Sequence, residues 1–181
     1  MANLQFNTNR CIDKMIETAR ICSKRDEGDV ILTDELSANT IPPFLPDGYL
    51  PKGVHLCSEP EATFRLGATS RRRRWLIIRL RKWCELGRLV GAKRLLVDGS
   101  FVTAKSEPHD VDAVMLLSPD FHDLLSHNDP AAIELDSMFR TRRPEELFAA
   151  EDEHDWQAWI EFFSRTREAD RRRKGLVEIF L

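Results

Sequence analysis

Two aspartates separated by one residue lie in a short apolar segment, Asp110–Leu117. If this segment is a strand, Asp110 and Asp112 point to the same face, because side chains alternate along a strand. Two carboxylates held that close repel each other unless a cation or a proton lies between them. Oxygen ligands suit magnesium, which keeps water and substrate phosphates as its remaining ligands. The segment therefore predicts a strand whose aspartates hold divalent metal ions.

A second apolar segment, Leu95–Val97, leads into Asp98, Gly99 and Ser100, and nine residues separate Ser100 from Asp110. A glycine allows the backbone to approach a ligand closely. The amide and the hydroxyl that follow it are donors for phosphate oxygens. We interpret the turn as the phosphate-binding half of a site and the aspartate segment as its metal-binding half.

A strand ending in Gly-Ser, followed at this distance by Asp-x-Asp in an apolar run, resembles the signature of the DNA-polymerase-β-like nucleotidyltransferase superfamily. Three flanking segments resemble small bacterial proteins grouped with that superfamily, and these are Leu50–His55, Asp98–Thr103 with Pro108, and Lys174–Val177. The resemblance covers about residues 46–181. It implies a nucleotidyltransferase-like α/β (α+β) fold, in which a small mixed sheet packs against helices.

The resemblance also implies roles for individual residues. Asp110 and Asp112 would be catalytic and would bind Mg²⁺ or Mn²⁺ for an in-line displacement. A nucleoside triphosphate would be the substrate. Its contacts would come from the turn and the residues after it, namely Gly99, Ser100, Thr103 and Lys105.

The superfamily pattern includes a third carboxylate on a later strand. In this chain the later strand-like segment is Gly175–Leu181, so Glu178 is the candidate. The acids between Glu145 and Asp155 are interpreted as helix surface and loop. The chain departs from the pattern before Asp110, where His109 replaces a common serine. It departs again after the turn, where Ala104-Lys105 replaces a common Arg-Gly.

The activity implied is transfer of a nucleoside monophosphate to a hydroxyl acceptor on a protein, an RNA or a small molecule. The related bacterial proteins suggest a cognate partner in a toxin–antitoxin or phage-defence system. One alternative is a catalytically inactive protein that keeps the fold and binds a partner, as an antitoxin does. Another is an RNA-binding module that uses the basic runs Arg71–Arg74 and Arg171–Lys174.

The first basic run also has a purely structural interpretation. A helix starting after Ser70 would show its arginines to water and pack its apolar side inward. That side consists of Leu76, Leu80, Trp83 and Val90. Trp83, Trp156 and Trp159 are expected to anchor the core rather than stack on bases.

Composition places the chain among folded proteins, since 42% of its residues are hydrophobic and 31% are charged. No apolar run approaches the roughly 20 residues that span a bilayer, and no leader opens the chain. A soluble cytoplasmic protein without membrane contact is expected. The spacing of Cys11, Cys22, Cys57 and Cys84 predicts reduced thiols and no structural zinc.

The remaining pattern divides the chain into an extension, residues 1–45, and a domain, residues 46–181. The extension holds an amphipathic helix within about residues 9–24 and the proline-rich segment Ile41–Gly48. The domain is expected to carry its helices mostly on one face of the sheet. Its expected elements are a helix at about 70–91, strands at about 93–98 and 111–117, a mainly helical region Pro130–Arg173, and a final strand Gly175–Leu181.

Overall fold

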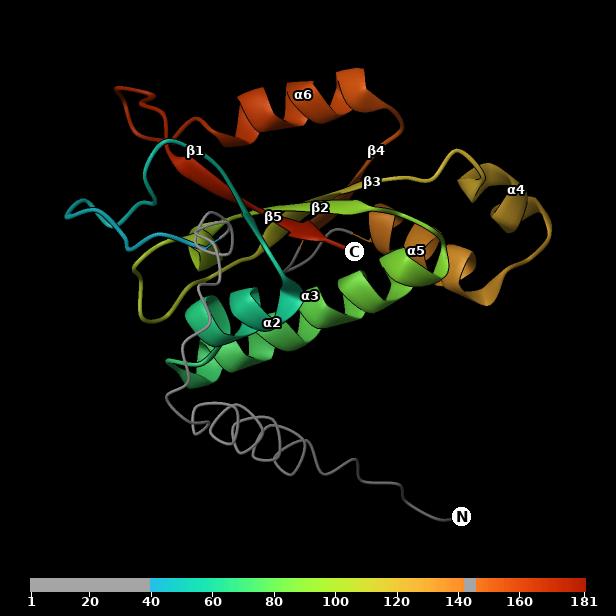
Figure 1. Ribbon diagram of the computed structural model, residues 1–181, viewed down its shortest axis with the longest axis horizontal. Helices are drawn as coiled ribbons and strands as arrows, with labels where there is room; N and C mark the ends of the chain where they lie inside the picture. Colours follow the sequence, from blue (N-terminus) through green and yellow to red (C-terminus); the bar gives the residue numbers. More distant parts are fainter. Residues whose placement is uncertain (1–39, 142–145) are drawn as a thin grey trace, which may run out of the picture. The chain divides into compact units, whose positions relative to one another are not determined.

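The computed structural model describes residues 40–141 and 146–181. The helix predicted within residues 9–24 lies outside this part. The described part is a mixed α/β domain built on a five-stranded sheet. This confirms the predicted fold class. Helices lie on both faces of the sheet, with α6 on one side and α3 and α5 on the other (Figure 1), and most of the described helices pack on the α3 side, as predicted.

The strand order is β1-β5-β2-β3-β4. The central strand β2 runs antiparallel to both of its neighbours, whereas β1 pairs with β5 and β3 pairs with β4 in parallel. The last residue of β2 is therefore level with the first residues of β3 and β4. The strands are β1 (Gly53–Cys57), β2 (Arg94–Asp98), β3 (Asp112–Leu116), β4 (Glu146–Ala150) and β5 (Gly175–Phe180).

The helix predicted at about 70–91 is confirmed as α3 (Arg71–Leu89). Ser70 caps it, since its hydroxyl accepts a hydrogen bond from the amide of Arg73. In the described part of the chain, no helix is long and apolar enough to cross a membrane. The other helical elements are α2 (Glu59–Ala62), η2 (Thr63–Gly67), η3 (Ser100–Val102), α4 (Phe121–Ser126), α5 (Pro130–Arg140) and α6 (Glu153–Phe163).

The sheet separates two apolar clusters. Because both of its faces are covered, its strands are apolar at nearly every position. Leu95, Val97 and Met115 face the α3 side, where the predicted inward residues of α3 are also buried. Leu96 and Val114 face α6. The predicted inward residues of α3 were Leu76, Leu80, Trp83 and Val90, and all four are buried.

The region Pro130–Arg173 was predicted to be mainly helical, and this is wrong for residues 146–150, which form β4. The segment Glu146–Ala150 is short and contains two alanines, so it carries no clear two-residue period and little strand preference. Pairing with β3 makes it a strand. Leu147 then faces the α3 cluster, and Phe148 packs against the α6 cluster.

Cys57 and Cys84 are buried and free, as expected of reduced thiols. Burial raises the pKa of each thiol to about 12. The reactive thiolate form is therefore disfavoured at both positions.

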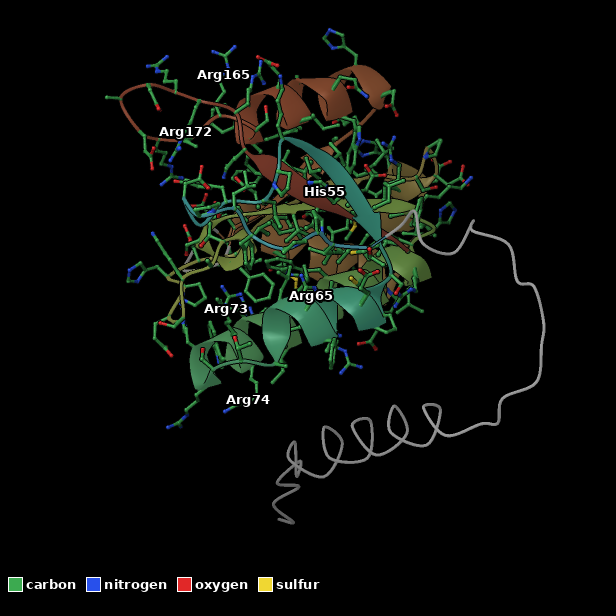
Figure 2. All side chains as sticks on the ribbon, turned by 60° about the vertical axis from the view of Figure 1, so that its left-hand side comes forward. His55, Arg65, Arg73, Arg74, Arg165 and Arg172 are labelled. Atoms are coloured by element: carbon green, nitrogen blue, oxygen red, sulfur yellow. The ribbon has the colours of Figure 1, made fainter. Side chains whose placement is uncertain are left out.

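Arg73 departs from the prediction that the first basic run faces water. It is 3% exposed, and Figure 2 shows it pointing into the domain while Arg74 points away. Its guanidinium donates to the carbonyl oxygens of Leu66 and Phe101, each at 2.9 Å. It also donates to those of Thr103 at 2.5 Å and Lys105 at 2.7 Å. A helix residue thus holds the loop that follows the Gly-Ser turn.

The neighbouring Arg72 holds the other end of the same loop. Its guanidinium donates to the carbonyl oxygen of Pro108 at 3.0 Å and to that of His109. The first turn of α3 therefore fixes residues 101–109, the nine residues between the Gly-Ser turn and the first aspartate. Arg72 and Arg73 therefore have a structural role, whereas the sequence pattern predicted that they face water.

We expect Arg73→Met to destabilise the protein strongly, because the buried carbonyl groups of Leu66 and Phe101 lose this donor. Leaving buried polar groups unsatisfied costs about 1–3 kcal/mol each, so a loss of about 3 kcal/mol or more is expected. Urea unfolding measures it. Arg74→Met is the control, since Arg74 is exposed and donates to the surface carbonyl of Ala68. Equal stability of the two variants would contradict a stabilising role for the hydrogen bonds of Arg73.

Candidate metal and nucleotide site

Three acidic residues meet at one edge of the sheet. Asp98 ends β2, Asp112 opens β3 and Glu146 opens β4. The strand register places Asp112 directly opposite both of the others. Directly opposed residues on neighbouring strands project from the same face of a sheet. Asp110 precedes β3 by two residues and adds a fourth carboxylate to this group, which we call the acidic edge.

The electrostatics of the acidic edge centre on Asp112. Burial, together with the charges of Asp110, Asp98 and Glu146, raises its pKa to about 7. Arg167 acts in the opposite direction on the same carboxyl. A carboxyl group with this pKa holds a proton for much of the time at neutral pH, and a divalent cation can take the place of that proton. The donor set, all oxygen, fits Mg²⁺ or Mn²⁺.

Gly99 joins the predicted phosphate-binding turn to the aspartate segment. Its φ of +83° and ψ of −177° lie in a region that side chains other than glycine rarely adopt. A Cβ atom there would lie 2.9 Å from the backbone nitrogen of Asp112 and 3.1 Å from the carbonyl oxygen of Asp110. The turn and the aspartates therefore form one rigid unit that requires glycine at this position.

Ser100 positions the first aspartate. Its amide donates to Oδ1 of Asp110 at 2.8 Å, and its hydroxyl contacts the same oxygen. Burial raises the pKa of Asp110, but the hydrogen bonds from Ser100 outweigh burial and leave that pKa below its ordinary value. Asp110 is thus ionised under conditions in which Asp112 is protonated. The two aspartates of the motif differ in charge because their surroundings differ.

The other nucleotide contacts expected from the sequence lie beside this turn. The hydroxyl of Thr103 donates to the carbonyl oxygen of Ser100 at 2.6 Å, so Thr103 holds the turn from within. Lys105 is exposed, and its carbonyl oxygen is bound by Arg73. His109 is exposed as well, and its amide donates to the hydroxyl of Ser100 at 2.8 Å.

The structure does not bring Glu178 to the acidic edge. Strand β5 is separated from β3 by β2, and Glu178 is opposite Leu96. Its buried carboxylate accepts hydrogen bonds from Arg94 at 2.7 and 3.2 Å. The acid brought beside Asp112 is Glu146. The interpretation of Glu146 as helix surface or loop is wrong because that residue opens β4.

Asp98 and Lys174 are site residues that sequence reasoning missed. Nζ of Lys174 lies 2.5 Å from Oδ1 of Asp98, and both side chains are nearly buried. Burial raises the pKa of Asp98, whereas the charge of Lys174 lowers it. The available signals were positional: Asp98 immediately precedes the Gly-Ser turn, and Lys174 immediately precedes the last strand. The lysine supplies an internal cation to one side of the acidic edge.

The loop between α6 and β5, residues 164–174, carries both cations of this site. Arg172 anchors the loop by pairing with Asp47 at 2.9 Å and lying 5.2 Å above the ring of Tyr49. Figure 2 shows Arg172 and Arg165 on this loop, next to the end of α6. The anchored loop presents Lys174 to the edge and Arg167 to the adjoining pocket.

An open pocket of about 420 Å³ adjoins the acidic edge, between α6 and the strands β3 and β4. Asp112, Glu146 and Arg167 supply charged groups to it. Its volume lies within the range of small-molecule sites. The rest of its lining is formed by Asp155, Ala158 and four aromatic residues, Phe148, Trp159, Phe162 and Phe163.

A second acidic group lies at the start of α6. Ligand atoms of Asp152, His154 and Asp155 lie within 4.8 Å of one another, and all three residues are exposed. Asp152 caps the helix, since its carboxylate accepts a hydrogen bond from the amide of Asp155. Helix capping therefore accounts for the position of Asp152.

The sequence matches the model of a family of unknown function, DUF6932, over residues 42–180. The chain belongs to the DUF6932 family. The match begins inside the proline-rich segment and includes all five strands, so the acidic edge and the pocket of this DUF6932 protein lie within the family domain. No curated protein and no solved structure matched the chain.

We expect Gly99→Ala to destabilise this DUF6932 protein by about 2 kcal/mol or more, because it adds both backbone strain and a clash with the Asp112 amide. Gly48→Ala is the matched control. Gly48 also has a φ of +83°, but a Cβ there would lie 3.7 Å from its nearest neighbour, Ala104. Thermal unfolding of both variants separates the clash from the strain. A similar loss of stability in both would show that the close approach at Gly99 is unimportant.

The raised pKa of Asp112 gives a pH prediction for this protein. Between pH 4 and 7 the folded protein binds a proton at Asp112 that the unfolded chain has released, so stability falls as pH rises through that window. Asp112→Asn removes this effect. We expect the melting temperature of the variant, relative to the native protein, to be higher at pH 8 than at pH 5 in EDTA. Each unit by which the pKa of Asp112 differs between the folded and the unfolded protein corresponds to about 1.4 kcal/mol in the free energy of unfolding.

Asp110→Asn is the counterpart of that experiment. The pKa of Asp110 is lowered in the folded protein, so its contribution to stability is present above the unfolded pKa and is lost as pH falls through the folded pKa. The Asp110 variant should therefore be less stable than the native protein at pH 8. A pH-independent difference for both variants would contradict the assigned electrostatics.

Proposed function

We propose that this protein is a metal-dependent nucleotidyltransferase that moves a nucleoside monophosphate from a nucleoside triphosphate to a hydroxyl acceptor. The observation that carries the proposal is the acidic edge itself. Asp110, Asp112 and Glu146 converge beside the rigid Gly99–Ser100 turn. Carboxylates that converge beside a glycine turn are compatible with a two-metal displacement.

In this proposal Asp110 and Asp112 hold Mg²⁺ or Mn²⁺. When bound, such ions neutralise charge on the triphosphate. Asp110, kept ionised by Ser100, is ready to act as a ligand, whereas Asp112 must release its proton first. Metal binding is therefore expected to release a proton and to strengthen as pH rises through 7.

Glu146 takes the place that the sequence pattern suggested for Glu178. Its carboxylate is the base that accepts the proton of the acceptor hydroxyl. The acceptor oxygen then forms a bond to the α-phosphorus, the bond from the α-phosphorus to the bridging oxygen breaks, and pyrophosphate leaves with that oxygen. Arg167 lowers the pKa of Asp110 and Asp112 through its charge and lines the adjoining pocket, where its guanidinium would bind the phosphates.

Calorimetry with the four nucleoside triphosphates, with and without Mg²⁺, tests the proposal. We expect magnesium-dependent binding that weakens at least tenfold in Asp112→Asn and in Glu146→Gln. The control is Glu151→Gln, because Glu151 is an exposed acid just beyond the other end of β4. Pyrophosphate release in the presence of candidate acceptors would then identify the reaction. Absence of magnesium-dependent binding by the native protein would contradict the transferase.

A second candidate function is that of a catalytically inactive, partner-binding protein, such as the antitoxin of a toxin–antitoxin pair. One observation favours it. Lys174 neutralises Asp98, and Ser100 satisfies Asp110, so half of the acidic edge is balanced by the protein's own groups. Such a protein would bind no nucleotide with Mg²⁺ and would copurify with the product of a neighbouring gene.

The basic runs give less support to RNA binding. Arg72 and Arg73 are engaged with backbone carbonyl groups of the domain. Arg172 and Arg173 form ion pairs with Asp47 and Glu161. These internal contacts compete with the phosphate neutralisation on which sequence-independent RNA binding depends.

A further inference from the structure

The pocket beside the acidic edge has an aromatic wall that the proposed chemistry does not use. Trp159 of α6 stacks in a tilted geometry on Phe148 of β4, with ring centroids 4.7 Å apart. It also meets Phe163 at 5.4 Å and Phe162 edge-on at 5.9 Å. Phe162 is 68% exposed. An exposed phenylalanine is unfavourable because its apolar ring is in contact with water. On a preformed aromatic cluster it also presents a flat apolar surface to a ligand.

The pocket also has a direction. Strand β4 begins at the acidic edge and runs away from it, and α6 runs back along the sheet (Figure 1). Asp155, in the first turn of α6, therefore lies at the far end of the pocket. Phe163 and Arg167 lie at the near end with Asp112 and Glu146. Asp155 and Phe163 lie eight positions apart on α6, about 12 Å at the helical rise.

This order of groups matches the parts of a nucleotide. The near end, with carboxylates for metal and an arginine, suits a triphosphate. The middle, with Trp159 and Phe162, suits the face of a base, since every base has a face that stacks on aromatic rings. The far end carries the carboxylate of Asp155, which only accepts hydrogen bonds when ionised. An apolar peptide would leave the charged groups at both ends unmatched.

We propose that the aromatic wall is the base subsite for the donor nucleoside triphosphate and that Asp155 selects guanine. Guanine presents two parallel donors, N1–H and N2–H, which match the two oxygens of one carboxylate. Adenine presents an acceptor beside its single amino group. The inference rests on the proposed function, because it assigns the base of the nucleotide whose triphosphate binds at the acidic edge.

Calorimetry with Mg²⁺ compares GTP with tripolyphosphate, which has the phosphates but no base. We expect Phe162→Ser to weaken GTP about tenfold, in line with the loss of base stacking, and to leave tripolyphosphate unchanged. The matched control is Phe64→Ser, since Phe64 is 73% exposed and belongs to η2 rather than to the pocket. It should change neither ligand.

The outcomes separate the two proposals. If the native protein binds tripolyphosphate as tightly as GTP, or if Phe162→Ser has no effect on GTP, the base subsite is wrong and the acidic edge stands. If neither ligand binds with Mg²⁺, the proposed function fails and the base subsite fails with it.

Base selection is tested by comparing GTP with ATP. We expect the native protein to favour GTP about tenfold, and Asp155→Asn to remove that preference while leaving ATP unchanged. The control is Asp123→Asn, which replaces an aspartate in the first turn of α4 and should keep the preference. A native protein that binds the two nucleotides equally would overturn the role of Asp155.

Discussion

The buried guanidinium of Arg73 joins the first turn of α3 to the loop that leads to the acidic edge. It donates to backbone carbonyl groups on both η2 and the loop after the Gly-Ser turn. Burial lowers the pKa of this arginine, which is the electrostatic cost of its position. The hydrogen bonds of Arg73 fix the backbone path of residues 101–105. With Arg72 holding the far end of the loop, Gly99 can press against the backbone of Asp112 and keep the site rigid.

The four carboxyl groups of the acidic edge differ in how far neighbouring groups stabilise their negative charge. Lys174 forms an ion pair with Asp98, and Ser100 stabilises the carboxylate of Asp110 by hydrogen bonds. Burial and the charges of Asp110, Asp98 and Glu146 raise the pKa of Asp112 to about 7, and the charge of Arg167 opposes this rise. Asp112 lies at the centre, where the pocket opens. This arrangement explains how one edge of a sheet can tolerate four carboxylates.

Local patterns predicted much of the domain. The apolar run before Gly99 and the run that contains Asp112 were predicted to be strands, and they form β2 and β3. Strands that are buried on both faces are continuously apolar, so their sequences alone indicate them. Ser70 and the helical spacing after it gave α3. Two of the four acids of the edge, Asp110 and Asp112, were predicted as site residues because they lie in the same short segment as the predicted strand.

Strong local signals in the sequence therefore specified individual strands, helices and the Gly-Ser turn. Which side chains come together depends instead on long-range pairing in the folded domain. Strand β4 exists because β3 pairs with it, and that pairing carries Glu146 to Asp112 while β2 keeps Glu178 away. Arg73 looks like its three arginine neighbours until the fold buries it. Contacts such as Lys174 with Asp98 join residues 76 positions apart, and no local periodicity encodes a distance of that kind.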